Sequence, residues 1–502
     1  MEHPIPLYNE LKVYNGGLRR LEIGFFAATL GLAFCLQWAR GAYTSDFASH
    51  PDEAAHVVSS LLVRDYMTQG IPQNPLTFAR AYYAHYPKVA IGHWPPLFHA
   101  TEAFWTLIFG RSKPAMISWI AVLGAGVTTL LFVWVRTVCG PVAGCFAAVV
   151  FFASALVQEA LSSVMLDLLL TLLAFAAAVC LGAFLQFREK RYAAWFTILA
   201  AAAVATNGRG IAIALLWIPT FALLSRSNGM RWLAALAVMV GIFLLPNLFP
   251  GAAPFSLSPY SQFLQPAAGV LSWPVAALAI LGSVTVFRNR FAHPEWVPVL
   301  GLLLSVLLFQ VLGNWPFEAR YFLPVAPALA ALAALGCRAC LDPLRAPLRL
   351  ALLALLVCAV LLLDVPHYSR KRDLGYHSFA KERLAQTHTT SLIAGDPVNE
   401  GSFIAEMDLA DSRPAHVVLR GSKVLADSTW AGQNYQMRFF SSGEVSAWLD
   451  RTDVTLVIVQ IQGSPHVSQL LEAVRLDTQH WHQLPIAPFP RNVRVFERWH
   501  EQ

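Results

Sequence analysis

The chain has 502 residues, of which 56% are hydrophobic and 13% are charged, and its mean hydropathy is +0.51. A soluble globular domain carries about a quarter charged residues, so this composition excludes an ordinary soluble protein. The net charge is +6, but no basic stretch is interleaved with aromatic residues as in nucleic-acid-binding proteins. We therefore expect a membrane protein that does not bind nucleic acid.

Long apolar runs recur along the chain, and the clearest are 21–39, 115–135 and 348–363. Each approaches the about 20 residues that cross a hydrocarbon core. The first run has no small-residue cleavage site, so we expect a retained span rather than a signal peptide. The sequence predicts about eleven transmembrane helices, near residues 20–40, 114–135, 141–157, 164–186, 192–205, 210–225, 231–249, 267–286, 295–313, 320–337 and 348–364.

Basic residues are divided unequally between alternate loops. With eleven spans, the loops on one side carry fourteen lysines and arginines, whereas the four short loops on the other carry only Arg209 and Arg320. Such a bias places the amino terminus in the cytoplasm. The apolar stretch 95–110 is predicted to lie in the membrane interface, because a further span there would reverse the bias. The first loop, 41–113, is then extracytoplasmic.

An acidic pair, Asp52 and Glu53, follows Pro51 near the start of this loop. Proline and carboxylates suit the first turn of a helix. In the residues that follow, apolar side chains recur at helical spacing and polar side chains occupy the opposite face. This pattern predicts an amphipathic helix on the membrane surface. On this local pattern alone, helix initiation explains the pair slightly better than chemistry does.

Five further polar residues fall on the same predicted side. Asp167 lies near the outer end of a span, where an uncompensated carboxylate is costly. Lys88 and His93 either anchor the interface or pair with a lipid-linked phosphate. Arg209 belongs either to a hairpin turn between spans or to a site. Arg320 has a nearby glutamate as a salt-bridge partner, yet a guanidinium at a lipid boundary also suits bidentate binding of a phosphate.

Acidic and phosphate-binding residues on one face at a lipid boundary favour group transfer from a lipid phosphate. A carboxylate would deprotonate an acceptor hydroxyl or amine, while cations would stabilise the departing phosphate. The sequence has no P-loop, dinucleotide motif or nucleophile elbow. Its seven cysteines form no zinc-type cluster and are expected to be buried free thiols. We predict no cofactor and leave a divalent metal ion open.

The ordered motifs resemble those of the GT-C glycosyltransferases, over about residues 10–365. They are Asp52-Glu53, His93-Trp94-Pro95-Pro96-Leu97, Met165-Leu166-Asp167 and Arg320-Tyr321-Phe322-Leu323-Pro324. The closest branch is that of bacterial family 39-like proteins, which are related to protein O-mannosyltransferases and the lipid A aminoarabinose transferase. Relatives often have a lysine directly before Pro-Pro-Leu, where this chain has Trp94, so Lys88 and His93 become the nearest cationic candidates.

This resemblance implies an inverting glycosyltransferase, hexosyl or pentosyl, in the bacterial cytoplasmic (inner) membrane. It would move a sugar from a polyprenyl-phosphate-linked donor, within membrane lipid, to an extracytoplasmic acceptor that is a lipid, a glycan or a protein. The catalytic residues implied are Asp52 as the base, Glu53 beside it, and Asp167. The residues implied in binding substrate phosphate are Lys88, His93, Arg209, Arg320 and Tyr321.

The fold predicted is thus a polytopic α-helical membrane domain of GT-C type, residues 1–365, followed by a small extracytoplasmic α/β domain, residues 366–502. The patterns in the tail predict strands at 391–394, 416–420, 454–460 and 493–498 and helices at 444–449 and 467–474. From its position, the tail is expected to bind the acceptor or cover the site.

Two other classes of protein remain open at this stage. A secondary transporter would place its intramembrane charges along a path. A non-catalytic membrane scaffold with an extracytoplasmic binding domain would leave the acidic and basic residues unexplained. The transferase hypothesis requires Asp52, Asp167 and Arg320 to converge on one cavity at the outer interface.

Overall fold

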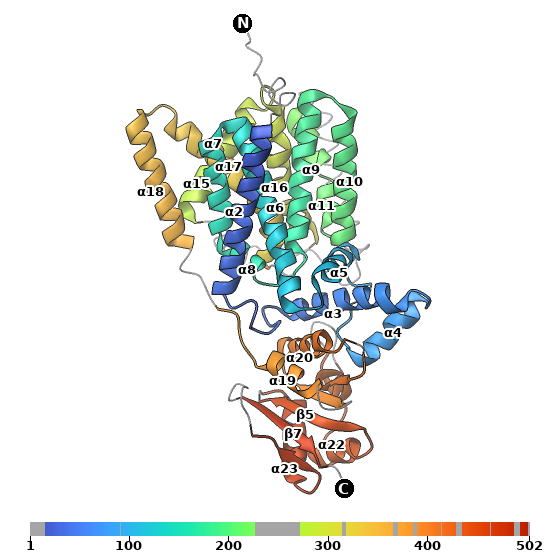
Figure 1. Ribbon diagram of the computed structural model, residues 1–502. Helices are drawn as coiled ribbons and strands as arrows, with labels where there is room; N and C mark the ends of the chain where they lie inside the picture. The colour runs from blue at the N-terminus through green and yellow to red at the C-terminus, as the bar shows by residue number, and fades with distance from the viewer. Residues whose placement is uncertain are drawn as a thin grey trace.

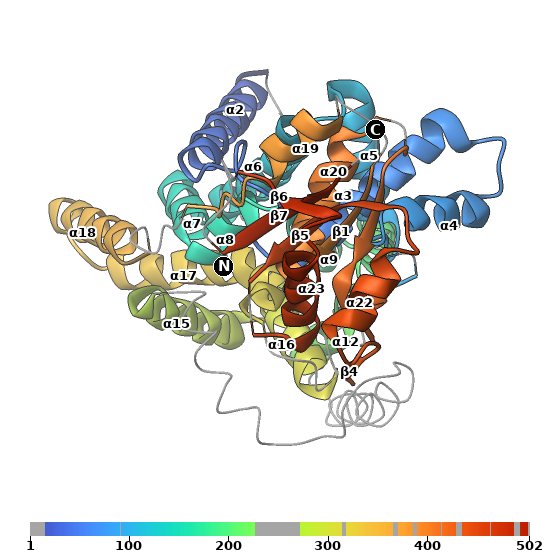
Figure 2. The ribbon, with the colours of Figure 1, turned by 90° about the horizontal axis from the view of Figure 1, so that it is seen from below.

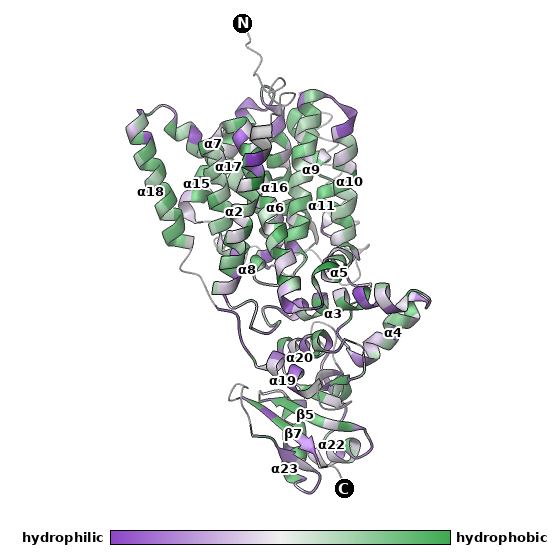
Figure 3. Ribbon diagram, in the orientation of Figure 1, coloured by the Kyte–Doolittle hydropathy of each residue, from purple (hydrophilic) through white to green (hydrophobic). Residues whose placement is uncertain are grey.

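The computed structural model describes residues 16–90, 92–225, 272–313, 318–364, 370–384, 389–412, 414–427, 434–461, 463–485 and 492–499. They form a bundle of helices with a smaller α/β domain beyond one end of it (Figure 1). Hydrophobic residues predominate along the bundle helices, and hydrophilic residues gather near the two ends of the bundle (Figure 3). The predicted span 231–249 and the start of the predicted span 267–286 lie outside the described residues.

The bundle is built from helices whose ends follow from local sequence. Helix α6 begins where Ser112 caps the backbone N–H of Ala115, and it ends at Gly140, whose φ of 93° favours glycine. The bundle helices are α2 (Gly16–Ala39), α6 (Lys113–Cys139), α7 (Pro141–Ala153), α8 (Ala155–Leu161), α9 (Asp167–Phe187), α10 (Lys190–Thr206), α11 (Gly210–Ala214), α12 (Trp217–Leu224), α15 (Trp273–Asn289), η3 (Pro294–Trp296), α16 (Val297–Gly313), η4 (Ala319–Val325), α17 (Ala326–Leu341) and α18 (Ala346–Asp364).

Several of these helices can cross a membrane. Five described helices are long and apolar enough, and a sixth crossing results if α7 and α8 are counted as one bent span. The five are Arg20–Ala39, Lys113–Cys139, Asp167–Phe187, Ala319–Leu341 and Ala346–Leu363. Shorter apolar helices occupy three more predicted positions. The chain is therefore a multi-pass α-helical protein, while the number eleven stays a prediction.

Two predicted spans are interrupted rather than continuous. The chain bends by 67° between α7 and α8, at Ser154, within the predicted span 141–157. The predicted span 210–225 is divided into α11 and α12 around Leu215 and Leu216. Hydropathy does not detect such breaks, because the residues on either side are equally apolar whether the helix bends or continues.

The first loop folds into short helices at the end of the bundle nearest the α/β domain. Helix α3 begins where Pro51 supplies the first turn and the Nδ1 atom of His50 accepts a hydrogen bond of 3.1 Å from the backbone N–H of Asp52. The loop elements are α3 (Pro51–Asp65), η1 (Tyr66–Gly70), α4 (Pro75–His85) and α5 (Leu97–Phe109). The predicted interfacial helix at 95–110 corresponds to α5.

Helix α3 lies across the end of the bundle, as the amphipathic pattern suggests (Figure 1). Its polar face is nevertheless not exposed to water, since Ser59, Ser60 and Asp65 are all buried. The amphipathic pattern does not predict this burial. Helix α20 (Pro397–Ala410) of the α/β domain packs against α3 and covers it, a contact that spans more than 300 residues of sequence.

The α/β domain contains a five-stranded sheet with the order β2-β1-β5-β7-β6. Strand β1 is parallel to β2 and β5, whereas β7 is antiparallel to β5 and β6. The predicted strands and helices are confirmed, apart from small shifts at their ends. The elements are α19 (Tyr376–Leu384), β1 (Thr390–Ala394), α20, β2 (Val417–Arg420), α21 (Gly421–Val424), β3 (Ala426–Asp427), β4 (Gln436–Met437), α22 (Ser442–Leu449), β5 (Val454–Gln460), α23 (Pro465–Leu476), β6 (Trp481–Gln483) and β7 (Val493–Arg498).

The sheet buries both faces. On one face, Ile393 and Ile458 join Phe403 of α20 in a hydrophobic core that continues into the bundle. On the other face, Val457 packs with Leu470 of α23 in a second core. Viewed from the end of the molecule that carries the α/β domain, α20 and the strands lie over α3 and the bundle (Figure 2). The α/β domain is thus joined to the membrane domain by a shared core.

All seven cysteines are free, as expected, but they are not generally buried. Only Cys337 is buried, whereas Cys35, Cys145, Cys340 and Cys358 are exposed on the bundle helices. The prediction of buried thiols is wrong here because the outer surface of a membrane bundle contacts lipid, where an apolar or weakly polar side chain carries no penalty for exposure.

Candidate active site

Asp52 and Arg320 form an ion pair at the end of the bundle that faces the α/β domain. The Nη2 of Arg320 donates to Oδ2 of Asp52 at 2.7 Å, and its Nε donates to Oε2 of Glu318 at 2.5 Å. His50 lies 3.4 Å from both Asp52 and Glu318. Burial alone would raise the pKa of Glu318, but hydrogen bonds from His50 and Arg320 outweigh it and lower that pKa to about 2. The expected salt bridge to Arg320 is confirmed, and it extends to Asp52.

Asp167, which belongs to a third part of the chain, also lies close to this pair. It is the first residue of α9, it is buried, and it interacts electrostatically with Arg320, Arg209 and Asp52. In the part of the chain that the structure describes, no ion pair joins Asp167 to a cation. The guanidinium of Arg209 lies 3.2 Å from the ring centre of Tyr321, and that of Arg320 lies 5.3 Å from it. Asp167 thus lies near the Asp52–Arg320 pair, whereas convergence of the three on one cavity stays a prediction.

Lys88 approaches the group from the side of the α/β domain. It is 3% exposed, and a Cβ atom added to Gly401 of α20 would lie 3.0 Å from its Cε. Its ammonium interacts electrostatically with Arg420, Glu400 and Asp52. Burial, with Arg420 as the second cause, lowers the pKa of Lys88 to about 7. Lys88 is therefore a cation whose charge depends on pH near neutrality.

Glu53 points away from its neighbour in sequence. Its Oε1 accepts hydrogen bonds from Nζ of Lys371 at 2.8 Å and from the backbone N–H of Val164 at 3.1 Å. Its Oε2 accepts from the backbone N–H of Ser49 at 2.8 Å. The carboxylate is fully buried. Glu53 therefore fixes the start of α3 against the bundle and against the chain that leads to the α/β domain.

His93 belongs to a different environment. It is exposed, and it lies edge-on to Trp94 with a ring separation of 4.5 Å. Both residues line a cavity of about 760 Å³ between α3, α4 and the start of α5. The other walls are mostly apolar, with Leu62 and Phe78 among them. The structure thus places His93 beside an apolar cavity.

Buried polar contacts attach α20 to the first loop, and sequence analysis did not predict them. Nζ of Lys113 donates to Glu406 at 2.5 Å, and Nη2 of Arg111 donates to Asp408 at 2.8 Å. These partners are separated by almost 300 residues, which leaves no local pattern. A signal did exist for Lys371, since three consecutive basic residues, 370–372, follow the last span within a few residues and contradict the charge bias.

One grouping among the described residues has the spacing of a metal site. Atoms of Asp450, Asp477 and His480 lie within 4.8 Å of one another in the α/β domain. Asp450 and His480 are exposed, and His480 already pairs with Asp477 at 2.9 Å. This surface group contains none of the residues of the Asp52–Arg320 pair, so it gives no support to metal binding there.

No protein-family model matches the sequence, and no curated protein matches it. Solved structures do match. ArnT from Cupriavidus metallidurans in the apo state has a TM-score of 0.57 at 15% identity, covering 94% of this chain and 98% of that chain. The same ArnT bound to undecaprenyl phosphate gives 0.50 at 14% identity, with the same coverage. Archaeoglobus fulgidus oligosaccharyltransferase tethered to an acceptor peptide gives 0.53 at 13% identity, covering 95% of this chain and 74% of that chain.

These matches extend over nearly the whole chain. Both matched proteins are members of the GT-C superfamily, so the GT-C fold predicted from the ordered motifs is confirmed. The class that fold and composition define is a multi-pass membrane protein with a GT-C fold. At such low identity the likeness establishes the fold, and the reaction has to be argued from the residues of the site.

Proposed function

We propose that the protein is a glycosyltransferase that moves a sugar from a polyprenyl-phosphate-linked donor to an acceptor at the extracytoplasmic face of the bacterial inner membrane. The observation that carries the proposal is the proximity of Asp52, Asp167 and Arg320 at one end of a GT-C fold. Support for a lipid-linked donor comes from the similar fold of ArnT, which was solved with undecaprenyl phosphate bound.

In the reaction proposed, the Asp52 carboxylate takes the proton from an acceptor hydroxyl or amine. The acceptor atom bonds to the anomeric carbon as the bond from that carbon to the phosphate oxygen breaks, and the electron pair stays on the phosphate. A single displacement of this kind inverts the anomeric configuration. General-base assistance contributes about 10²–10⁴-fold to such a step. The hydrogen bond from Arg320 holds the carboxylate of Asp52 in position.

The departing polyprenyl phosphate carries negative charge, which the cations of the site would stabilise. The guanidinium groups of Arg320 and Arg209 flank Tyr321 and are suited to bidentate phosphate binding. Lys88 adds an ammonium near Asp52. Asp167, next to both arginines, would orient them or bind a sugar hydroxyl. Preorganised charges at the leaving group are the largest contribution expected in this class of chemistry.

The test is transfer of labelled sugar by the purified protein in lipid nanodiscs. We expect Asp52→Asn to lower turnover about 10²–10⁴-fold while the protein remains folded. Glu159→Gln is the matched control, because Glu159 is an exposed carboxylate in the nearby helix α8, and it should keep full activity. A folded Asp52→Asn variant with full turnover would remove Asp52 from the mechanism. Solute uptake into liposomes without any transfer would instead indicate a transporter.

Donor and acceptor are identified in cells. Lipid-linked sugars and envelope glycans are compared between a strain that lacks this protein and its parent. We expect one polyprenyl-linked sugar to accumulate and one envelope glycan to lose the same sugar. Unchanged lipid-linked and envelope sugars would contradict the proposed reaction.

A further inference from the structure

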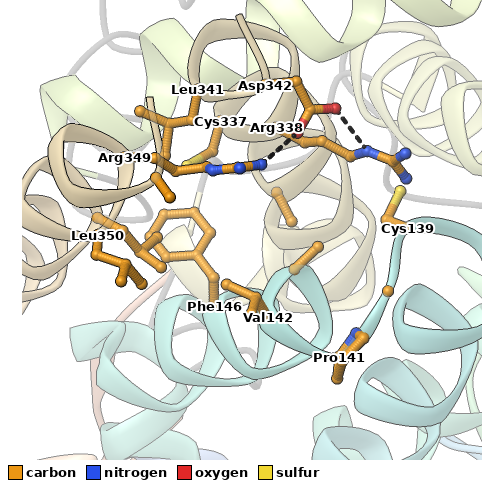
Figure 4. Close-up of a pocket in the computed structure, with 15 residues that line it drawn as sticks. Cys139, Pro141, Val142, Phe146, Cys337, Arg338, Leu341, Asp342, Arg349 and Leu350 are labelled. Carbon is orange, nitrogen blue, oxygen red and sulfur yellow. Dashed lines mark hydrogen bonds and ion pairs between the residues drawn. The ribbon is translucent and has the colours of Figure 1, made fainter. Parts of the chain in front are cut away.

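A cavity of about 420 Å³ lies at the end of the bundle opposite the α/β domain. Its walls come from the turn between α6 and α7, the end of α17 and the start of α18. Figure 4 shows the apolar side chains of Val142, Phe146 and Leu350 below a cluster of charged groups, with Leu341 next to that cluster. A cavity with an apolar floor and a charged rim matches an amphipathic ligand.

The charged rim consists of two guanidinium groups that share one carboxylate. Nε of Arg338 donates to Asp342 at 3.0 Å, and Nη1 of Arg349 donates to the other oxygen of Asp342 at 3.5 Å (Figure 4). The side chains of Arg338 and Arg349 are each 44% exposed, and that of Asp342 is 50% exposed. Ion pairs that are this exposed are weak. The rim thus has one positive charge in excess, and both guanidinium groups remain accessible to an anion.

A second cavity lies further along α7 and shares no lining residue with the first. It measures about 530 Å³, lies between α2, α7 and α18, and is almost wholly apolar. Phe146 of α7 lines the first cavity, and Val149 and Phe152 of the same helix line the second. Leu353 and Leu361 of α18 do likewise. The two cavities thus lie in succession along α7 and α18, the first with a charged rim and the second almost wholly apolar.

Helix α18 packs against the rest of the protein over only a small part of its surface. Only 6% of its membrane-spanning window is buried, and the helix stands at the edge of the bundle (Figure 1). The end that carries Arg338 and Arg349 is also the side with the excess of basic residues, which is the cytoplasmic leaflet by the charge rule. Basic pockets between membrane helices on that side are typical binding sites for anionic lipid headgroups.

We propose that this surface binds an anionic phospholipid of the cytoplasmic leaflet. Its phosphate would lie between Arg338 and Arg349, and an acyl chain would follow α7 into the second cavity between α2 and α18. The bound lipid would fill the gap between α7 and α18. The apolar path distinguishes a lipid from a soluble phosphate, which could use only the charged rim.

The proposal is tested by native mass spectrometry of the full chain with phosphatidylglycerol and phosphatidylcholine. The wild type should retain phosphatidylglycerol preferentially. Arg338→Gln and Arg349→Gln should each weaken that retention about fivefold, and together about 25-fold. Arg290→Gln is the matched control, since Arg290 follows α15 on the same predicted side and binds the carbonyl of Phe287; it should leave the preference unchanged.

A second variant keeps the test decisive if the arginine variants fold poorly. Val149→Trp fills the apolar cavity without altering charge, and it should weaken binding of the two-chain lipid while leaving glycerol phosphate unaffected. Equal retention of both lipids by the wild type would overturn the proposal. So would an unchanged preference in the double arginine variant, or binding of glycerol phosphate as tight as that of phosphatidylglycerol, which would indicate a site for soluble anions.

Discussion

At the scale of single residues, the position of Asp52 in the fold matters more than its position in the sequence. Its neighbour Glu53 has the same carboxylate and stands one place along the same helix, yet it points into the protein towards Lys371 and Val164. Successive residues of a helix point about 100° apart. The pair is thus divided into a group that faces Arg320 and a group that anchors α3.

The pH dependence of activity follows from Lys88, whose pKa is lowered by burial to about 7. Its ammonium is charged below this pH and loses its proton above it. If Lys88 binds the donor phosphate, kcat/KM for the donor should fall as pH rises through about 7. Lys88→Arg should move this fall to much higher pH, because a guanidinium stays protonated. Lys381→Arg, at an exposed position in α19, is the control, and equal profiles for all three proteins would contradict the assignment.

A second residue predicts an effect on stability. Glu102 of α5 is fully buried, and neither of its carboxylate oxygens has a hydrogen-bond partner among the described residues. Burial raises the pKa of Glu102 well above its ordinary value of 4.5. Below pH 4.5 the group is neutral in both states, and as pH rises above 4.5 ionisation favours the unfolded chain. Glu102→Gln should therefore raise the thermal midpoint at pH 7 more than at pH 4, measured in detergent; an equal change at both pH values would contradict the prediction.

At the scale of secondary-structure elements, α3 is held between two layers. The bundle lies on one side, and α20 approaches so closely on the other that a Cβ on Gly401 would lie 3.1 Å from that of Ala54. The amphipathic pattern of α3 correctly predicts a helix at the end of the bundle. It does not predict that α20 packs on α3 or that Ser59 and Asp65 are buried, since both depend on contacts with other segments of the chain.

The start of α3 should depend on the buried pair between Glu53 and Lys371, which are both at most 5% exposed. Lys371→Met leaves an unpaired buried carboxylate, and removing one partner of a buried pair costs about 3–5 kcal/mol. We expect a marked loss of thermal stability. The double variant Glu53→Gln with Lys371→Met should recover most of it, because no unpaired charge remains. Equal losses in the single and double variants would show that the two residues are not coupled.

At the scale of the whole molecule, the membrane part and the α/β domain behave as one folded unit. Their hydrophobic core is continuous, and Glu406 and Asp408 of α20 neutralise Lys113 and Arg111 of the first loop in buried pairs. Separation would expose apolar surface and leave Lys113 without its carboxylate partner, both of which are costly. The α/β domain is therefore required for the stability of the first loop, whatever part it takes in binding an acceptor.

Because the two parts share a core, we predict that they stay together when the chain between them is cut. A protease site is inserted after Pro366, and the folded protein is cleaved in detergent. We expect both fragments to elute together in size-exclusion chromatography, even in 1 M salt, where exposed ion pairs are screened but buried contacts persist. Uncleaved protein is the control. Release of the α/β domain on cleavage would contradict a shared core.

The sequence by itself determined the membrane class, the GT-C fold and the candidates Asp52, Asp167 and Arg320. These depend on local information, namely apolar runs of spanning length, the charge bias between loops, and short ordered motifs. It also located four strands of the α/β domain, β1, β2, β5 and β7, because a short apolar run bounded by turn residues is a local signal.

Only the tertiary structure decided which of the two adjacent carboxylates faces Arg320, what covers α3, and where α7 and α11 break. Each of these depends on contacts between segments far apart in the chain, such as the Asp52–Arg320 bond across 268 residues. Helical periodicity fixes the direction in which a side chain leaves its helix, but not the partner that it meets.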